Sequence, residues 1–195
     1  MKSPLLLTTA VAVLLVACAT GKVSRIEPTG ERAVTTAGGI DIKDWLTASE
    51  AMIQSLLSSG RIVTPPDSAA VMAISRIANN TTQQVDTDLL VKNIRIALNK
   101  SGKIVTTTTV GLGGTAEDPL AKELAAKRAA AGGPNRVPDP SYTLSGKILE
   151  NRQQQGNAKT TSYVFQLSLT DVNGIAVWED QKIISKYSKR TFLGL

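Results

Sequence analysis

The sequence predicts a single small α/β domain, with a mixed sheet of four to five strands flanked by helices, behind an N-terminal signal and a tether. Three observations predict this class. Two strand-like segments are separated by an amphipathic helix, the last third alternates apolar and polar residues, and the first forty residues show neither pattern. A chain of 195 residues has room for one such domain and its appendages.

The composition argues against several kinds of chemistry. The chain has no histidine, which removes the commonest general base and metal ligand, and its one cysteine excludes an internal disulfide and a thiolate zinc site. We therefore expect no catalytic residue, no metal and no cofactor. The formal net charge of +6 is spread along the chain without a basic stripe of interleaved aromatic residues, so nucleic-acid binding is not expected.

The first seventeen residues have the pattern of a secretion signal. Lys2 precedes an apolar run, residues 5–16, that is shorter than the roughly 20 residues needed to span a bilayer. The run ends in Leu15-Val16-Ala17-Cys18, which resembles the lipobox of bacterial lipoproteins. This pattern predicts cleavage between Ala17 and Cys18 and acylation of Cys18, which anchors the chain stably. The alternative is an incidental cysteine behind a plain secretory signal, but the position and flanks of this cysteine favour lipidation.

Residues 18–40 are expected to form the lipidated N-terminus and a flexible tether, because they are polar and rich in glycine without sustained periodicity. Fully stretched, such a tether reaches at most about 75 Å. Ala19, rather than aspartate, follows the cysteine. By resemblance to lipoprotein sorting in Gram-negative envelopes, this residue predicts an outer-membrane lipoprotein that faces the periplasm.

The domain, residues 41–195, is expected to begin with a helix over Lys43–Ser59, with Asp41 as N-cap and Gly60 as terminator. Its apolar residues fall on one face: Trp45, Leu46, Met52, Ile53, Leu56 and Leu57. A strand over Val71–Ile77 is apolar enough for the centre of a sheet that is covered on both faces.

A turn at Asn79–Thr82, a helix over Thr87–Lys100 and a strand over Ile104–Val110 follow. Strand, helix and strand in succession imply a parallel pair with a right-handed crossover. A third helix over Asp118–Ala131 has a thin apolar face, which places it near the edge of the domain.

Period-two alternation then predicts three antiparallel strands in the last third of the chain. The first covers Tyr142–Ile148 and is followed by a polar stretch, and the second covers Tyr163–Thr170. The third covers Ile175–Ser185 after a hairpin turn at Asn173–Gly174, whose residue types tolerate the positive φ of a type I′ turn.

Two patterns suggest sites and have simpler explanations. Gly111-Leu112-Gly113-Gly114 could cradle a phosphate, but it lacks the lysine of a P-loop, and a flexible connection is favoured. Glu179 and Asp180 are a carboxylate pair in sequence, but neighbouring strand residues point to opposite faces, so a solvated strand edge is favoured.

Two further patterns suggest a binding surface. Asn79-Asn80-Thr81-Thr82 presents hydrogen-bonding groups that a partner could use, although a locally capped turn favours the same residue types. Lys182, Lys186, Lys189 and Arg190 form a basic tail, which either touches anionic phospholipid or cell-wall material or adds ordinary solubilising charge. None of the four patterns is an active site, so the residues indicate a tethered binding module.

Several of these segments, taken in order, resemble the LpoB family of penicillin-binding protein activator lipoproteins. The order begins with the lipobox, the tether and the first helix, followed by the strand Val71–Ile77 with Asn79–Thr82 ahead of an amphipathic helix. Three later segments complete the resemblance: residues 140–148 (PSYTLSGKI), 163–171 (YVFQLSLTD) and 177–183 (VWEDQKI). It covers about Lys43 to Lys189.

The resemblance implies a fold like the N-terminal domain of TolB. It also implies an outer-membrane lipoprotein that binds the periplasmic region of a bifunctional penicillin-binding protein and activates it, which regulates cell-wall synthesis. Peptidoglycan is a further candidate partner, and no docking residues are carried over. The alternatives are a structural lipoprotein of an outer-membrane or secretion assembly without synthase activation, and a carrier of a small ligand, which needs a sizeable apolar cavity.

Overall fold

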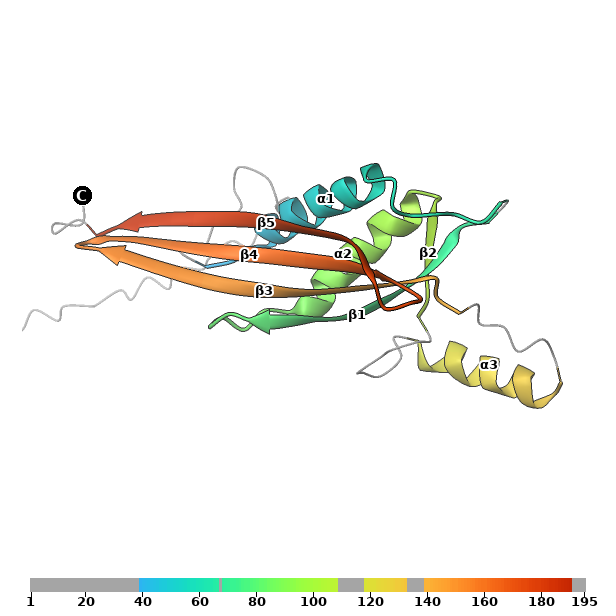
Figure 1. Cartoon of the computed structure of the whole chain (residues 1–195). Helices are drawn as coiled ribbons and strands as arrows, with labels where there is room; N and C mark the ends of the chain where they lie inside the picture. The colour runs from blue at the N-terminus through green and yellow to red at the C-terminus, as the bar shows by residue number, and fades with distance from the viewer. Residues whose placement is uncertain (1–38, 67, 109–117, 133–138, 191–195) are drawn as a thin grey trace, which may run out of the picture.

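The computed structural model describes residues 39–66, 68–108, 118–132 and 139–190 (Figure 1). In these residues helices and strands follow in the order α1 (Ile42–Ser58), β1 (Ala70–Asn80), α2 (Thr87–Lys100), β2 (Ile104–Thr106), α3 (Pro119–Ala130), β3 (Tyr142–Gln155), β4 (Ala158–Asp171) and β5 (Ala176–Lys189). The predicted class, a small α/β domain with a mixed sheet, is confirmed.

The sheet has the strand order β2-β1-β3-β4-β5. β1 is parallel to both β2 and β3, so the predicted parallel pair around the first crossover is confirmed. β3, β4 and β5 form an antiparallel meander, as the alternation of the last third predicts, and these three strands run side by side along the molecule (Figure 1). In the hairpin turn between β4 and β5, Gly174 has φ +79°, the left-handed conformation that the Asn-Gly pair favours.

The hydrophobic core lies between one face of the sheet and the helices α1 and α2. α1 packs against β5 and α2, and α2 packs against β1 and β2. Trp45 of α1 meets Phe165 of β4 edge to face, with ring centroids 5.5 Å apart. Burying a large apolar side chain contributes about 1.5–3 kcal/mol. The largest fully buried side chains are Tyr163, Phe165, Met52, Leu56, Met72, Ile77, Leu90, Ile94, Leu98, Ile104, Leu144 and Ile148.

α1 begins where the sequence predicts, at the N-cap Asp41. The Asp41 carboxylate accepts the backbone N–H of Asp44 at 3.1 Å, and the Asp44 carboxylate accepts the backbone N–H of Asp41 at 2.9 Å. This reciprocal capping satisfies donors that the first helical turn leaves free. Gly60, with φ +68°, follows the end of the helix as predicted.

Five predicted strand boundaries were wrong by three residues or more, because backbone pairing rather than side-chain polarity decides where a strand ends. β4 begins at Ala158 instead of Tyr163, and β5 ends at Lys189 instead of Ser185. β1 continues to Asn80, so Asn79 and Asn80 belong to the strand and the turn starts at Thr81. β3 continues through the polar stretch to Gln155, which pairs with Ala158 of β4. β2 stops at Thr106 instead of reaching Val110, which lies outside the described residues.

The prediction that β1 is covered on both faces is only half right. Met72 and Ile74 pack into the layer below α1 and α2. On the opposite face Val71 is half-buried and Ala73 is 4% exposed, but no helix among the described residues packs closely on that face. α3 contributes no buried residue to the core and lies beside the sheet (Figure 1), as its thin apolar face predicts.

Candidate interaction surface

The face of the sheet opposite α1 and α2 is the candidate interaction surface, and we call it the open face. Because successive strand residues point to opposite faces, the neighbours of the buried residues in β3, β4 and β5 all lie on it. It consists of Thr143, Ser145, Lys147, Leu149 and Asn151 of β3, of Ser162, Val164, Gln166, Ser168 and Thr170 of β4, and of Glu179, Gln181, Ile183, Ser185 and Tyr187 of β5.

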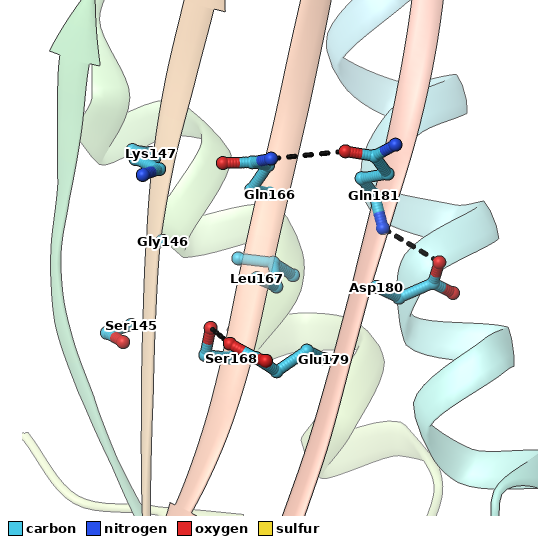
Figure 2. A pocket seen from close by; sticks show the side chains of 9 residues that line it. All are labelled: Ser145, Gly146, Lys147, Gln166, Leu167, Ser168, Glu179, Asp180 and Gln181. Atoms are coloured by element: carbon cyan, nitrogen blue, oxygen red, sulfur yellow. Dashed lines mark hydrogen bonds between the residues drawn. The ribbon is translucent and has the colours of Figure 1, made fainter. Parts of the chain in front are cut away.

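The strand register arranges these side chains in rows across the sheet. In one row the Gln166 Nε2 donates a hydrogen bond to Gln181 Oε1 at 3.1 Å, and in the next row the Ser168 hydroxyl donates to Glu179 Oε1 at 2.7 Å (Figure 2). Lys147 and Ser145 continue the two rows on β3. Together these side chains line a depression of about 610 Å³. Its lining is mostly polar, unlike the apolar cavity that a small-ligand carrier needs.

An apolar row crosses the open face next to these polar rows. The register places Leu149, Val164 and Ile183 beside one another on β3, β4 and β5. Leu149 and Val164 are half-buried, and Ile183 at the edge strand is 52% exposed. Beyond this row the hydroxyls of Ser162 and Ser185 lie 2.8 Å apart.

The open face carries few charged side chains. Two of the fifteen residues named above, Lys147 and Glu179, are charged, a somewhat smaller share than the 19% of the whole chain, and the other side chains are mainly hydroxyls, amides and apolar groups. Depletion of charged residues, an apolar centre and a surrounding of hydrogen-bonding groups are features of protein–protein interfaces. This arrangement can therefore bind another protein surface by shape and hydrogen bonding, without attraction between opposite charges.

Three of the four hydrogen-bonding residues predicted at positions 79–82, Asn79, Thr81 and Thr82, make hydrogen bonds inside the domain. Thr81 donates its backbone N–H to Asn79 Oδ1 at 3.1 Å, and the Thr82 N–H and hydroxyl both donate to Glu150 Oε2 at 2.8 Å. Arg152 donates to the Glu150 carboxylate and to the Thr82 hydroxyl. The structure thus supports the interpretation as a locally capped turn.

The carboxylate of Glu150 is held in its charged form by this cluster. Burial acts to raise its pKa, but the hydrogen bonds from Thr82 and the ion pair with Arg152 outweigh burial and hold the pKa below its usual value. Glu150 belongs to β3 and accepts hydrogen bonds from Thr82 in the turn, so its carboxylate fastens the β1–α2 connection to the sheet. Its role is structural.

The predicted basic tail is part of β5 rather than a tail. Lys186 lies on the helix side of β5, where its Nζ is 2.8 Å from Asp41 Oδ2 and 2.6 Å from Asp44 Oδ2. This ion pair joins the start of α1 to the edge strand. Glu179 and Asp180 lie on opposite faces of β5, as expected for neighbouring strand residues: Glu179 bonds Ser168, and Asp180 bonds a backbone N–H of its own strand.

Sequence reasoning missed the open face because its residues are the polar half of an alternating pattern, and such residues are ordinarily read as solvated. The signal was the number of amide and hydroxyl side chains among the polar residues of these strands. Ala17, Cys18 and Gly111–Gly114 lie outside the described residues. In the described ranges no three His, Cys, Asp or Glu side chains cluster as metal ligands would. None of the described helices is long and apolar enough to cross a membrane.

Comparisons with known proteins found one family model and several solved structures that are similar to this chain. The family model described as peptidoglycan-synthase activator LpoB matches residues 44–184. The LpoB C-terminal domain from Salmonella enterica is 17% identical, with a TM-score of 0.44 over 72% of this chain and 98% of that chain. The NMR structure of Escherichia coli LpoB is 16% identical, with a TM-score of 0.41 over 93% and 84%. Lipoprotein GNA1162 from Neisseria meningitidis is 14% identical, with a TM-score of 0.39 over 64% and 88%. No curated protein matches the sequence.

Proposed function

Because this chain belongs to the LpoB family of peptidoglycan-synthase activators, we propose that it binds and activates a bifunctional penicillin-binding protein through the open face of its sheet. The observation that carries the proposal is the open face, whose side chains are mainly uncharged, with its apolar row, Leu149, Val164 and Ile183. A protein that activates another must present a surface to it, and this face has the composition of an interface.

The described residues fit a role in binding. Two charged groups of the predicted patterns have partners inside the domain, since Lys186 pairs with Asp41 and Glu179 accepts a hydrogen bond from Ser168. Activation then means that the domain binds the active conformation of the synthase more tightly than the inactive one, since a ligand shifts an equilibrium only by its difference in affinity. The binding energy comes from complementary surfaces.

The proposal includes the membrane anchor. Residues 1–17 are removed, Cys18 is acylated, and residues 18–40 tether the domain to the outer membrane, where it faces the periplasm. The tether enters the domain at a fixed point, because the backbone N–H of Ile40 donates to Gln83 Oε1 at 2.9 Å and Asp41 caps α1. The domain reaches the synthase only where the peptidoglycan between the two membranes leaves room, so synthesis is stimulated where the wall is open.

The test measures glycan polymerisation and peptide crosslinking by the purified cognate synthase, with and without the full-length lipoprotein in detergent. We expect the lipoprotein to raise both rates. Val164→Lys puts an ammonium group into the apolar row and should weaken binding at least about tenfold, because an unpaired charge is costly in an interface. Val164→Thr keeps the β-branched shape and is the matched control, with an expected loss of about threefold at most.

Circular dichroism and thermal unfolding of both variants show whether the fold is retained. Two results would count against the proposal. A wild-type lipoprotein that neither binds the synthase nor changes its rate would end it. Equal stimulation by wild type and Val164→Lys would leave activation standing but would remove the open face as the docking surface.

A further inference from the structure

β5 is a long edge strand. It pairs with β4 over Ala176–Lys189, and in the described residues no strand pairs with its other side. A strand in this position presents backbone N–H and C=O groups along its free edge, where another strand can be added. The question is which residues present them.

Two hydrogen bonds, one at Arg190 directly after β5 and one at Gln181 within it, identify the residues whose backbone groups face the free edge. The backbone N–H of Arg190 donates to the carbonyl of Asn157 at 3.0 Å, and hydrogen-bonded and non-hydrogen-bonded residues alternate along an antiparallel pair. The register is uninterrupted from Lys189 back to Trp178. The backbone N–H and C=O groups of even-numbered β5 residues therefore bond to β4, and those of odd-numbered β5 residues point away from β4 to the free edge. The N–H of Gln181 agrees, because it is bonded by the neighbouring Asp180 carboxylate at 2.7 Å. The outward groups therefore belong to residues 179, 181, 183, 185 and 187.

We infer that this edge accepts an extended strand of the synthase, which adds to the sheet beside β5. The inference rests on the proposed function, because the occupant is the same partner. The reason for choosing this occupant is continuity: the apolar row of the open face ends at the edge in Ile183, which is 52% exposed, and Tyr187, further along the same face of β5, is 67% exposed. One partner that covers the open face would therefore meet the edge at the same residues.

The edge also defines the chemistry of the added strand. Main-chain hydrogen bonds to the odd-numbered residues supply affinity, and alternate side chains supply specificity. On the open face an apolar residue of the added strand would lie beside Ile183 or Tyr187. On the helix side, the half-buried Lys182 would lie beside an acidic residue. α1 packs against the helix side of β5 and runs along it behind the sheet (Figure 2).

A matched pair of variants in the full-length lipoprotein isolates the outward backbone donor at position 185. Ser185→Pro and Ser185→Ala both remove the hydroxyl that contacts Ser162, but only proline also removes the outward N–H. Proline is tolerated on an edge strand where the N–H faces solvent. We expect Ser185→Pro to bind the synthase about tenfold more weakly than Ser185→Ala, the effect of one interfacial hydrogen bond together with the strand distortion.

Amide hydrogen exchange of the wild-type lipoprotein, followed by NMR with and without the synthase, gives a second readout that needs no variant. The N–H groups of Ile183, Ser185 and Tyr187 should exchange quickly in the free protein and slowly in the complex. The even-numbered amides should be protected in both. Strand addition should slow exchange only at the odd-numbered amides when the synthase binds. Burial of a sheet face without strand addition would not give this alternating pattern.

The outcomes separate the two proposals. If the wild type binds and stimulates the synthase but the odd-numbered amides stay unprotected, or Ser185→Pro binds as well as Ser185→Ala, strand addition is overturned and the proposed function stands. If the odd-numbered amides are protected without the synthase and the lipoprotein sediments as a dimer, the edge belongs to a second copy and the inference is overturned. If the wild type does not bind the synthase, both proposals fail.

Discussion

The two faces of the sheet differ although they are built from the same three strands. In β4, Phe165 is 1% exposed beneath α1, while its neighbour Gln166 lies on the open face and bonds Gln181. The helix-covered face is filled with large apolar side chains, and the open face carries amides, hydroxyls and a single apolar row. Hydrophobic burial therefore stabilises the fold from one side only. The other side can change its residues for recognition at little cost to folding.

The strongest test of this difference compares two neighbours in β4. Phe165→Ala removes a ring that packs on Trp45 and leaves a cavity in the core, so the free energy of unfolding should fall by about 3–5 kcal/mol. Gln166→Ala removes an exposed amide and should change it by less than about 0.5 kcal/mol. Urea unfolding followed by circular dichroism measures both. Similar losses in the two variants would mean that the open face is also part of the core.

A second test uses the one position of β3 where the helix-covered face has no side chain. A Cβ at Gly146 would lie 2.6 Å from the carbonyl oxygen of Gln166 and 2.6 Å from Leu167 Cδ2. The oxygen belongs to the backbone of the neighbouring strand and cannot move aside. Gly146→Ala should therefore destabilise the domain by about 2–3 kcal/mol in a thermal unfolding experiment. Ser145→Ala, on the open face, is the control and should be nearly neutral.

The third test concerns the ion pair that fastens the edge strand to α1. Lys186→Met keeps the length of the side chain but leaves Asp41 and Asp44 without their ammonium partner. The side chains of the three residues are 16%, 13% and 14% exposed, so the loss should be about 2 kcal/mol, less than for a fully buried pair. Lys182→Met removes a charge from the same strand and should cost less than about 0.5 kcal/mol. An equal effect of both variants would assign the loss to net charge.

The same ion pair predicts how stability depends on pH. Burial acts to raise the pKa of Asp41, but the hydrogen bonds from Lys186 and from the N–H of Asp44 hold it below the usual 3.8. Asp41 therefore contributes stability above pH 3.8 that is lost as pH falls through its lowered pKa. Burial acts to lower the pKa of Lys186, but its bonds to Asp41 and Asp44 hold it above the usual 10.5.

The contribution of Lys186 is consequently complete below pH 10.5 and is lost as pH rises through the raised value. Denaturant unfolding over a range of pH checks both directions. The difference between wild type and Lys186→Met should be constant near neutral pH and should shrink in strong acid and in strong alkali. A difference that stays the same from pH 2 to pH 12 would show that Lys186 acts by packing alone.

Sequence patterns were sufficient for the elements that bury a periodic face. The stripe of α2 and the capping of α1 by Asp41 followed from spacing and are where they were predicted, whereas the predicted alternation of β4 is present but the strand begins at Ala158 rather than Tyr163. The ends of β1, β2 and β3 were wrong because a strand continues as long as its backbone is paired. Gln155 is in a strand because Ala158 lies opposite, which its own residue type does not indicate.

The candidate site was not predictable in the same way. Sequence analysis pointed to residues with reactive or charged groups, such as Glu179 and Lys186, and the structure gives them partners within the domain. The open face is made from unremarkable residues whose common property appears only when the strand register is known. Val164 and Ile183 are nineteen positions apart in the chain and neighbours in the sheet. Only the pairing of three strands brings such residues together.

The smallest effect is expected in α3, which belongs to neither face. Leu124 is 46% exposed and the helix contributes no buried residue, so Leu124→Lys should change the free energy of unfolding by less than about 0.5 kcal/mol. Leu98→Ala in α2, where the leucine is fully buried, is the matched contrast and should cost about 2–5 kcal/mol. A loss above about 1 kcal/mol for Leu124→Lys would show that α3 is packed in solution. The helix would then belong with the covered side of the sheet, and the stability of the domain would no longer come from one face alone.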